Sequence, residues 1–293
     1  MTVDQFAEFW RLQGHKVIET KSCYWYNPYS FSFISLPYHR LVNPQRSELV
    51  RVLLGGPAVV IRFPGVLNGI GKEGGLFICS DRNYDLSSLH QKARNQTRRG
   101  LEQCIIEQID FAYLAEHGHA LNVETFQRQG RNPQTLTEQK WRQYCKAASR
   151  FPDFEAWGAF VNGRLASFVV ISLVEDYCYI LLQSSATGYL KYYPNNALIF
   201  TVTKLKLSRT EVNYVSYGFK SLEDTAGLNH FKLRMGFKIK PFKECVVFNP
   251  LLKPFLILGG RKIIKWISHK FPESDLWRKA SRALDIAEGK LDV

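Results

Sequence analysis

The sequence predicts a mixed α/β (α+β) fold in which sheets are flanked by helices. Strand-like runs alternate with helical segments from residue 84 to residue 248, and an Asn162-Gly163 pair joins two apolar runs, which is a strong hairpin signal. The length of 293 residues suits two domains of roughly 150 residues each. With 45% hydrophobic and 14% aromatic residues, the chain is not a disordered, collagen-like or low-complexity protein.

The first eighty residues are typical of strands and turns. Apolar and aromatic runs are separated by Gly, Pro and Asn and lie at 15–28, 31–37, 57–65 and 75–80. Residues 84–104 then predict an amphipathic, strongly basic helix with apolar side chains at helical spacing, whose start Asp85 or Ser87 can cap. A short extended piece follows, and further helical segments are expected up to about residue 150.

After residue 157 the pattern is that of a hairpin followed by alternating elements. A second turn near residue 175 leads into another strand, and residues 194–209 predict a helix that Asn195 or Asn196 is placed to cap. A strand at 212–219, a helix at 227–237 and a strand at 238–248 complete this unit.

The charge and the cysteines limit the class of protein. Lys and Arg number 39 against 26 Asp and Glu, a net charge of +13 that favours anionic partners. The six cysteines are widely spaced without a C-x-x-C pair, which excludes a ribbon-type zinc site and disfavours a disulfide scaffold. The N-terminus lacks the features of a secretory signal, so we expect a reduced, cytoplasmic protein.

The last forty residues differ from the rest, because apolar side chains are interspersed with lysines and arginines. Residues 238–270 carry eight Lys or Arg and one Glu. Two interpretations remain open for 251–270. The segment could lie on an anionic membrane interface with Trp266 at headgroup depth, or it could pack on the core as a terminal helix with its lysines in solvent.

Several apparent motifs lack the context that their chemistry needs. Gly69-x-Gly71-x-x-Gly74 has the spelling of a dinucleotide fingerprint, but it lies between two strand-like runs and opens no helix, so we expect a glycine-rich hairpin. His117 and His119 have no further ligands nearby, so no metal site is expected. Nucleotide-binding P-loop, serine-hydrolase and zinc-protease motifs do not occur.

Two motifs carry a resemblance to a known family. The elements from the hairpin onward resemble the C-terminal half of GNAT-type acyltransferases. More narrowly, the chain is similar to the FemABX group, whose G-L-x-x-F-K-x-x-x-G-F signature is matched by Gly227, Leu228, Phe231, Lys232, Gly236 and Phe237. The basic helix that ends the first subdomain of that group is matched by Lys92, Arg94, Arg98 and Arg99.

The resemblance implies a domain organisation. We expect two tandem GNAT-like subdomains, each a mixed and mostly antiparallel sheet flanked by helices, at residues 1–110 and 111–250. A basic amphipathic helical tail follows at 251–293. The loop that binds the CoA pyrophosphate in ordinary GNAT enzymes is matched only in part in this sequence, because residues 189–197 interrupt it.

The resemblance also implies a set of site residues. Tyr217 is expected as general acid and Lys232 as the positive charge for the donor. The residues expected to bind the donor are Gln183, Ser184, Ser185, Asn195, Asn196 and Phe231, and Arg98 and Arg99 are expected to bind an anionic acceptor. A purely structural role stays open for most of these residues. Lys232 could be a solvated lysine and Tyr217 a core or rim side chain. Asn195 and Asn196 could cap a helix, and Arg98 and Arg99 could belong to a solvated face.

The function that follows is transfer of an acyl group from acyl-CoA to an amine of a small or cell-envelope acceptor, in a bacterium. No tightly bound cofactor is expected. One alternative is an aminoacyl-tRNA-dependent Fem-type transferase acting on a peptidoglycan precursor, and tRNA contact suits the positive charge. Acyl-CoA is preferred because no charged heptad run for a tRNA-binding arm lies between residues 110 and 248. A non-catalytic protein that binds polyanions or a membrane surface is the second alternative.

Overall fold

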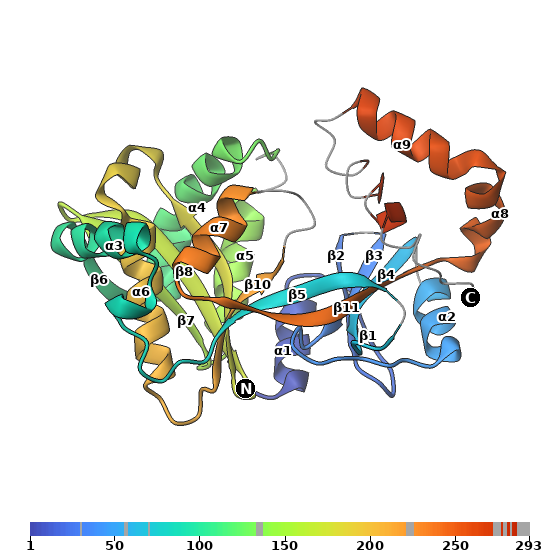
Figure 1. The fold of residues 1–293 in the computed structure, drawn as a ribbon, viewed down its shortest axis with the longest axis horizontal. Helices are drawn as coiled ribbons and strands as arrows, with labels where there is room; N and C mark the ends of the chain where they lie inside the picture. The colour runs from blue at the N-terminus through green and yellow to red at the C-terminus, as the bar shows by residue number, and fades with distance from the viewer. Residues whose placement is uncertain are drawn as a thin grey trace. The chain divides into compact units, whose positions relative to one another are not determined.

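The computed structural model confirms a mixed α/β fold in which helices flank the strands (Figure 1). The structure describes residues 1–29, 31–55, 58–69, 71–132, 137–220, 226–271, 277, 280–281 and 283–285. Contacts divide the chain into two compact units, each of which is discontinuous in sequence. The first unit comprises Met1–Gln5 and Leu76–Lys240, and the second comprises Phe6–Gly75 and Pro241–Val293. Residues 76–110 therefore belong with the later part of the chain, whereas the sequence assigned them to the first subdomain.

The first unit is built on a mixed sheet. Its strands follow the order β5 (Lys72–Cys79), β10 (Tyr214–Phe219), β9 (Tyr177–Ser185), β8 (Arg164–Val174), β7 (Phe154–Val161) and β6 (Ile105–Ile109). β10 runs parallel to β9, and the other pairings described in this unit are antiparallel. Both central residues of the β7–β8 turn have positive φ, 51° at Asn162 and 74° at Gly163, so the predicted hairpin is confirmed.

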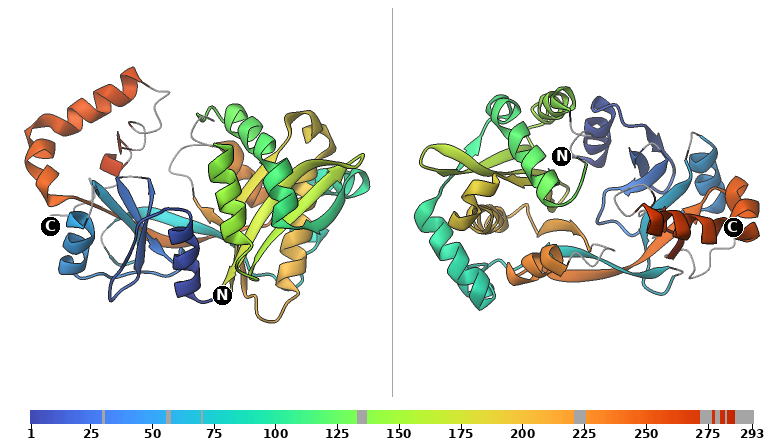
Figure 2. Two further views of the ribbon diagram at one scale, coloured as in Figure 1. Left: turned by 180° about the vertical axis from the view of Figure 1, so that it is seen from behind. Right: turned by 90° about the horizontal axis from the view of Figure 1, so that it is seen from above.

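Helices cover the two faces of this sheet (Figure 2). α3 (Gln91–Gln103), α6 (Pro194–Leu207) and α7 (Ala226–Arg234) lie on one side, where Val169 joins the cluster of buried apolar side chains that α3 and α6 share. α4 (Phe111–Arg128) and α5 (Glu138–Ala148) lie on the other side, where the neighbouring Phe168 contacts Trp141. This alternation of β8 side chains is what a strand buried on both faces requires.

The basic helix starts later than the sequence predicts. A short 3₁₀ turn at Leu86–Ser88, capped by Asp85, precedes α3, whose N-cap is His90. Asp85 therefore caps the 3₁₀ turn and not the helix. The backbone leaves helical geometry at Leu89, whose φ and ψ are −87° and 145°.

The second unit contains a smaller sheet with its own core. Its strand order is β1 (Val17–Glu19), β2 (Tyr24–Tyr29), β3 (Ser32–Leu36), β4 (Val60–Gly65) and β11 (Lys238–Phe248). The core contains Trp25, Phe33, Ile61 and Val247. The first eighty residues were expected to contain only strands and turns, but α1 (Val3–Leu12) and α2 (Arg46–Leu54) are helical. Each is short and buries a few apolar residues on one side, a signal that the surrounding strand-like runs obscure.

The predicted glycine-rich hairpin is wrong. β4 and β5 are not neighbours, because β11 lies between them. A Cβ atom on Gly71 would lie 2.6 Å from the carbonyl oxygen of Glu244, and one on Gly74 would lie 2.8 Å from the ring of Phe242. The glycines therefore allow β11 to approach closely. The segment opens no helix, as expected, so it lacks the geometry of a dinucleotide loop.

The tail after β11 is helical but broken. It consists of η4 (Pro250–Leu252), α8 (Lys253–Phe255), the π-helical turn η5 (Leu256–Gly260) and α9 (Arg261–Lys270). In the part of the chain that the structure describes, no helix combines the length and the apolar character needed to cross a membrane. None of the six cysteines, all of which lie in the described ranges, forms a disulfide.

Candidate functional site

The site begins where two parallel strands separate. β10 pairs with β9 at three positions, and the last of them joins Ser216 to Tyr179. Beyond Tyr179 the described pairing of β9 is with β8 alone, and its register shifts between Ile180 and Leu182. The extra residue, Leu181, is a β-bulge that turns β9 away from β10. The two strands therefore diverge over Ile180–Ser185, beside the buried face of α6.

Five side chains meet beside this divergence, and we call them the Lys232 cluster: Phe77, Gln183, Tyr217, Phe231 and Lys232. The ammonium of Lys232 lies 4.8 Å from the ring centre of Phe77 and 5.1 Å from that of Tyr217. It also donates to the carbonyl of Phe219 at 3.4 Å. The Tyr217 hydroxyl donates to Oε1 of Gln183, and Phe231 meets the Tyr217 ring edge-on at 6.2 Å.

A second group of polar side chains lies at the end of β9, and we call it the Arg128 network: Thr125, Arg128, Ser167, Ser185, Thr187 and Asn195. Arg128, the last residue of α4, donates to the Ser185 hydroxyl at 2.9 Å and to the Thr187 hydroxyl at 2.9 Å. Asn195 donates to the same Ser185 hydroxyl at 3.2 Å. Among the described residues, every group that Arg128 hydrogen-bonds is neutral, so it forms no ion pair there.

The start of α6 offers few free backbone amides. Its N-cap is Tyr193, in the left-handed region at φ 56°, and Pro194 follows without an N–H. The amides of Asn196 and Ala197 donate to the Tyr193 carbonyl, at 3.1 and 3.2 Å. The prediction that Asn195 or Asn196 caps this helix is therefore wrong, because both lie inside it. The 3₁₀ turn η3 (Thr187–Tyr192) ends directly before Tyr193, which is therefore the N-cap of α6.

Comparison with solved structures shows which known fold the chain shares. FemX matches with a TM-score of 0.59 at 13% identity, over 85% of this chain and 92% of that chain. Neither compact unit alone holds 85% of the residues, so the match extends over both. The chain has the fold of FemX.

A second structure supports the same fold. It is the C-terminal domain of a protein assigned as a lysylphosphatidylglycerol synthetase from Agrobacterium fabrum, with a TM-score of 0.55 at 11% identity over 83% of this chain and 87% of that chain. No protein-family model matches the sequence, and no curated protein matches it either. The likeness to these two structures thus lies in the fold.

The fold brings some of the predicted residues together and keeps others apart. Gln183, Tyr217, Phe231 and Lys232 meet in the Lys232 cluster, and Ser185 and Asn195 meet in the Arg128 network. Ser184 points to the other face of the sheet, where its hydroxyl donates to Asn122. Asn196 lies against Met235, with 3.6 Å between Nδ2 and Sδ.

Arg98 and Arg99 lie apart from both groups. They are exposed on α3, and no hydrogen bond or ion pair among the described residues joins them to the other predicted site residues. Arg128 and Phe77, in contrast, belong to the site but were not predicted. They lie 57 residues before Ser185 and 155 residues before Lys232, and neither stands in a motif that marks it.

Burial controls the protonation of the Lys232 cluster. Lys232 is 5% exposed, and loss of hydration lowers the pKa of its amine to about 8. Burial likewise raises the pKa of the Tyr217 phenol well above its usual range. Both groups therefore carry their protons near neutral pH. Within the described ranges no carboxylate forms an ion pair with Lys232. A buried ammonium surrounded by two rings and a carbonyl is suited to an anionic partner.

The lowered pKa of the Lys232 amine leads to a prediction about the free energy of unfolding. Its pKa falls from 10.5 in the unfolded chain to about 8 in the folded one, so the unfolded state binds more protons between these two values. Below pH 8 the buried charge costs about 3 kcal/mol, and this cost disappears as the pH rises towards 10.5. Lys232→Met should therefore be the more stable protein at pH 7, by about 3 kcal/mol, with little difference at pH 10.5. Urea unfolding of both proteins across this range measures it, and a constant difference would contradict it.

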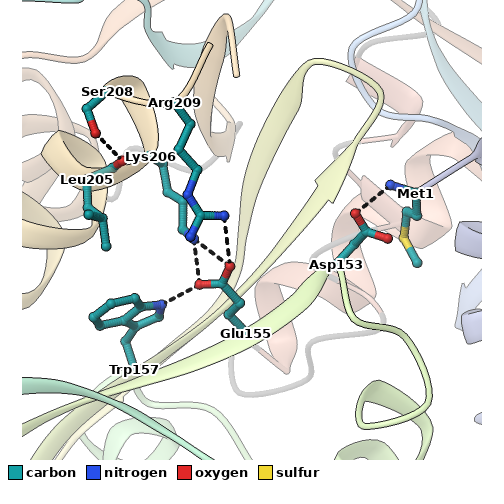
Figure 3. A network of polar contacts seen from close by, with 8 residues as sticks. All are labelled: Met1, Asp153, Glu155, Trp157, Leu205, Lys206, Ser208 and Arg209. Atoms are coloured by element: carbon teal, nitrogen blue, oxygen red, sulfur yellow. Dashed lines mark hydrogen bonds and ion pairs between the residues drawn. The ribbon is translucent and has the colours of Figure 1, made fainter. Parts of the chain in front are cut away.

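A separate polar network lies at the other end of α6 (Figure 3). The carboxylate of Glu155 on β7 accepts from the ammonium of Lys206 at 2.5 Å, from the indole of Trp157 at 2.8 Å and from Arg209 at 3.4 Å. Lys206 is 3% exposed. Both cations contact the same carboxylate, so this network stabilises the junction of β7 and α6.

No group of His, Cys, Asp and Glu in the described part of the chain could hold a metal ion.

Proposed function

We propose that this chain is an acyltransferase that moves an acyl group from acyl-CoA to the amine of a small or cell-envelope acceptor. The observation that supports it most is the Lys232 cluster, a buried ammonium without a carboxylate partner among the described residues, beside the divergence of β9 and β10 in a GNAT fold. Both acyl-CoA and the alternative donor, aminoacyl-tRNA, are cytoplasmic, so we expect the reaction to take place there.

The proposed reaction places the donor thioester between the diverging strands. Backbone N–H groups near the Leu181 bulge and the Lys232 ammonium stabilise the negative charge that develops on the carbonyl oxygen. The acceptor nitrogen attacks the carbonyl carbon at about 3–3.5 Å, and the C–S bond breaks. Tyr217 gives its proton to the leaving sulfur, and the proton lost by the amine restores the phenol. The raised pKa of Tyr217 keeps that proton available at neutral pH.

The Arg128 network would hold the donor phosphates. The amides at the start of α6 are largely used within the chain, and the Thr187 amide donates to the Glu124 carboxylate at 2.6 Å. A pyrophosphate therefore needs a side-chain cation instead. Arg128 supplies a guanidinium whose contacts are neutral hydroxyls and a carbonyl, next to Ser185 at the end of β9.

The test combines binding and turnover. Acyl-CoA should raise the unfolding temperature, and Arg128→Ala should raise the KM for acyl-CoA about tenfold, the value of one lost charged hydrogen bond, while kcat stays nearly unchanged. Arg131→Ala is the matched control, because Arg131 lies three residues further on and stacks on Phe126 at 3.9 Å. Absence of any thermal shift or turnover with CoA thioesters of several chain lengths would rule out this donor.

An aminoacyl-tRNA donor is the second candidate. The occupied amides of α6 favour it, and so do Arg98 and Arg99, which present two exposed cations on α3. It predicts that charged tRNA binds more tightly than uncharged tRNA and that Arg98→Glu with Arg99→Glu weakens both. Equal, salt-sensitive binding to any polyanion without turnover would instead favour a non-catalytic protein.

A further inference from the structure

The tail after β11 exposes an unusual number of large apolar side chains. The exposed fraction is 75% for Leu251, 86% for Leu258 and 60% for Trp266. Together with three others they form what we call the tail patch: Leu251, Phe255, Leu258, Ile263, Trp266 and Phe271. All ten residues of α9 are described, and none of them is buried. So many exposed large apolar side chains on one short segment indicate a binding surface.

Specific contacts fix the shape of the tail. The side-chain amide of Asn249 donates to the carbonyls of Leu53 and Ala58, at 3.2 and 2.9 Å, and its oxygen accepts from the amide of Leu251 at 3.0 Å. Leu251 is thereby held beside the end of α2. The chain then bends at Gly259, which has φ 108°, so Leu258 lies at the bend between α8 and α9.

Charge accompanies the apolar surface. Residues 250–271 contain five Lys or Arg and no Asp or Glu, and one of the five, Lys265, forms an ion pair with Asp285 at 3.0 Å. At 100° per residue, Arg261, Lys262, Lys265 and His269 fall on one side of α9, and Ile263, Ile264, Ile267 and Phe271 fall on the other. Trp266 and Lys270 lie at the boundary, where the ammonium of Lys270 is 4.9 Å from the Trp266 ring.

We propose that residues 250–271 dock the protein on an anionic lipid bilayer, with the tail patch at the boundary between headgroups and acyl chains. A basic face, an apolar face and a tryptophan between them fit that interface. A second copy of this chain fits poorly, because a two-fold contact would bring two tails with five positive charges each against one another. This inference does not depend on the proposed acyl transfer.

Sedimentation with vesicles tests it. The full-length protein should bind vesicles of phosphatidylcholine that contain about a quarter phosphatidylglycerol, and should bind pure phosphatidylcholine at least about tenfold more weakly. Leu258→Ser and Trp266→Ser should each reduce binding to the anionic vesicles several-fold. Lys262→Gln should reduce it about fivefold, the value of one lysine charge near such a surface. Ile105→Ser is the matched control, since Ile105 is 68% exposed on β6 in the other unit.

Two results would overturn the proposal. One is equal binding, or none, to anionic and neutral vesicles. The other is a dimer in solution that Leu258→Ser dissociates, which would assign the tail patch to a second copy. Turnover of a soluble acceptor is measured in parallel, because the tail variants should leave it unchanged and so separate this inference from the proposed reaction.

Discussion

Replacing Lys232 with methionine should lower the rate of acyl transfer by about 100-fold or more, through kcat. Methionine keeps most of the volume of the side chain between the rings of Phe77 and Tyr217, so the change removes the charge and little of the packing. Because the role assigned to Lys232 requires its proton, the wild-type rate should fall as the pH rises above about 8.

The control for this result is an exposed lysine with a similar aromatic neighbour. Lys204 lies 5.9 Å from the ring of Phe200 on α6 and is exposed, so Lys204→Met should leave turnover unchanged. Steady-state rates from pH 6 to 10 measure both variants. A rate that rises through pH 8 would make the neutral amine the active form, and a Lys232→Met enzyme within threefold of the wild type would remove Lys232 from the mechanism.

Glu155→Gln is expected to destabilise the protein by about 4 kcal/mol, a large part of the stability of a typical domain. The substitution leaves the ammonium of Lys206, which is 3% exposed, without the carboxylate that it contacts at 2.5 Å. The midpoint of urea unfolding, followed by circular dichroism, measures the effect.

A double variant keeps this prediction testable if the single variant fails to fold. Lys206→Met combined with Glu155→Gln removes both charges, so most of the lost stability should return. A single variant as stable as the wild type would mean that this ion pair contributes nothing. The double variant should also retain acyl transfer, because no hydrogen bond or ion pair among the described residues joins this network to the Lys232 cluster.

The elements after residue 157 could be predicted because their signals are local. Asn162-Gly163 specifies a turn through its own backbone, and the signature around Lys232 marks α7 within eleven residues. The position of β11 could not be predicted, because the glycines at 71 and 74 are explained only by Phe242 and Glu244, about 170 residues later. A glycine in the sequence indicates that another segment packs closely against it, but it does not identify that segment.

The residues of the candidate site fall into the same two groups, those with a local signal in the sequence and those without one. Lys232 and Phe231 stand in a recognisable motif, and Tyr217 stands at the end of a predicted strand, so sequence reasoning reached all three. Arg128 joins the site only because α4 crosses the end of β9, and an arginine at the end of a helix is otherwise ordinary. The side of the sheet that each serine faces was also hidden, because the bulge at Leu181 changes the alternation of β9.

The discontinuity of the two units has a consequence for how the chain acquires its structure during synthesis. The second unit combines residues 6–75 with residues that are synthesised much later, because β4 pairs with β11 along Lys243–Phe248. At about 5–20 residues per second, the ribosome releases β4 many seconds before its partner strand exists. Through that interval one edge of β4 has no strand to pair with, and such edges attract other chains. The first unit is complete once residue 240 has emerged, so it can fold before the second unit, which at that point still lacks most of β11.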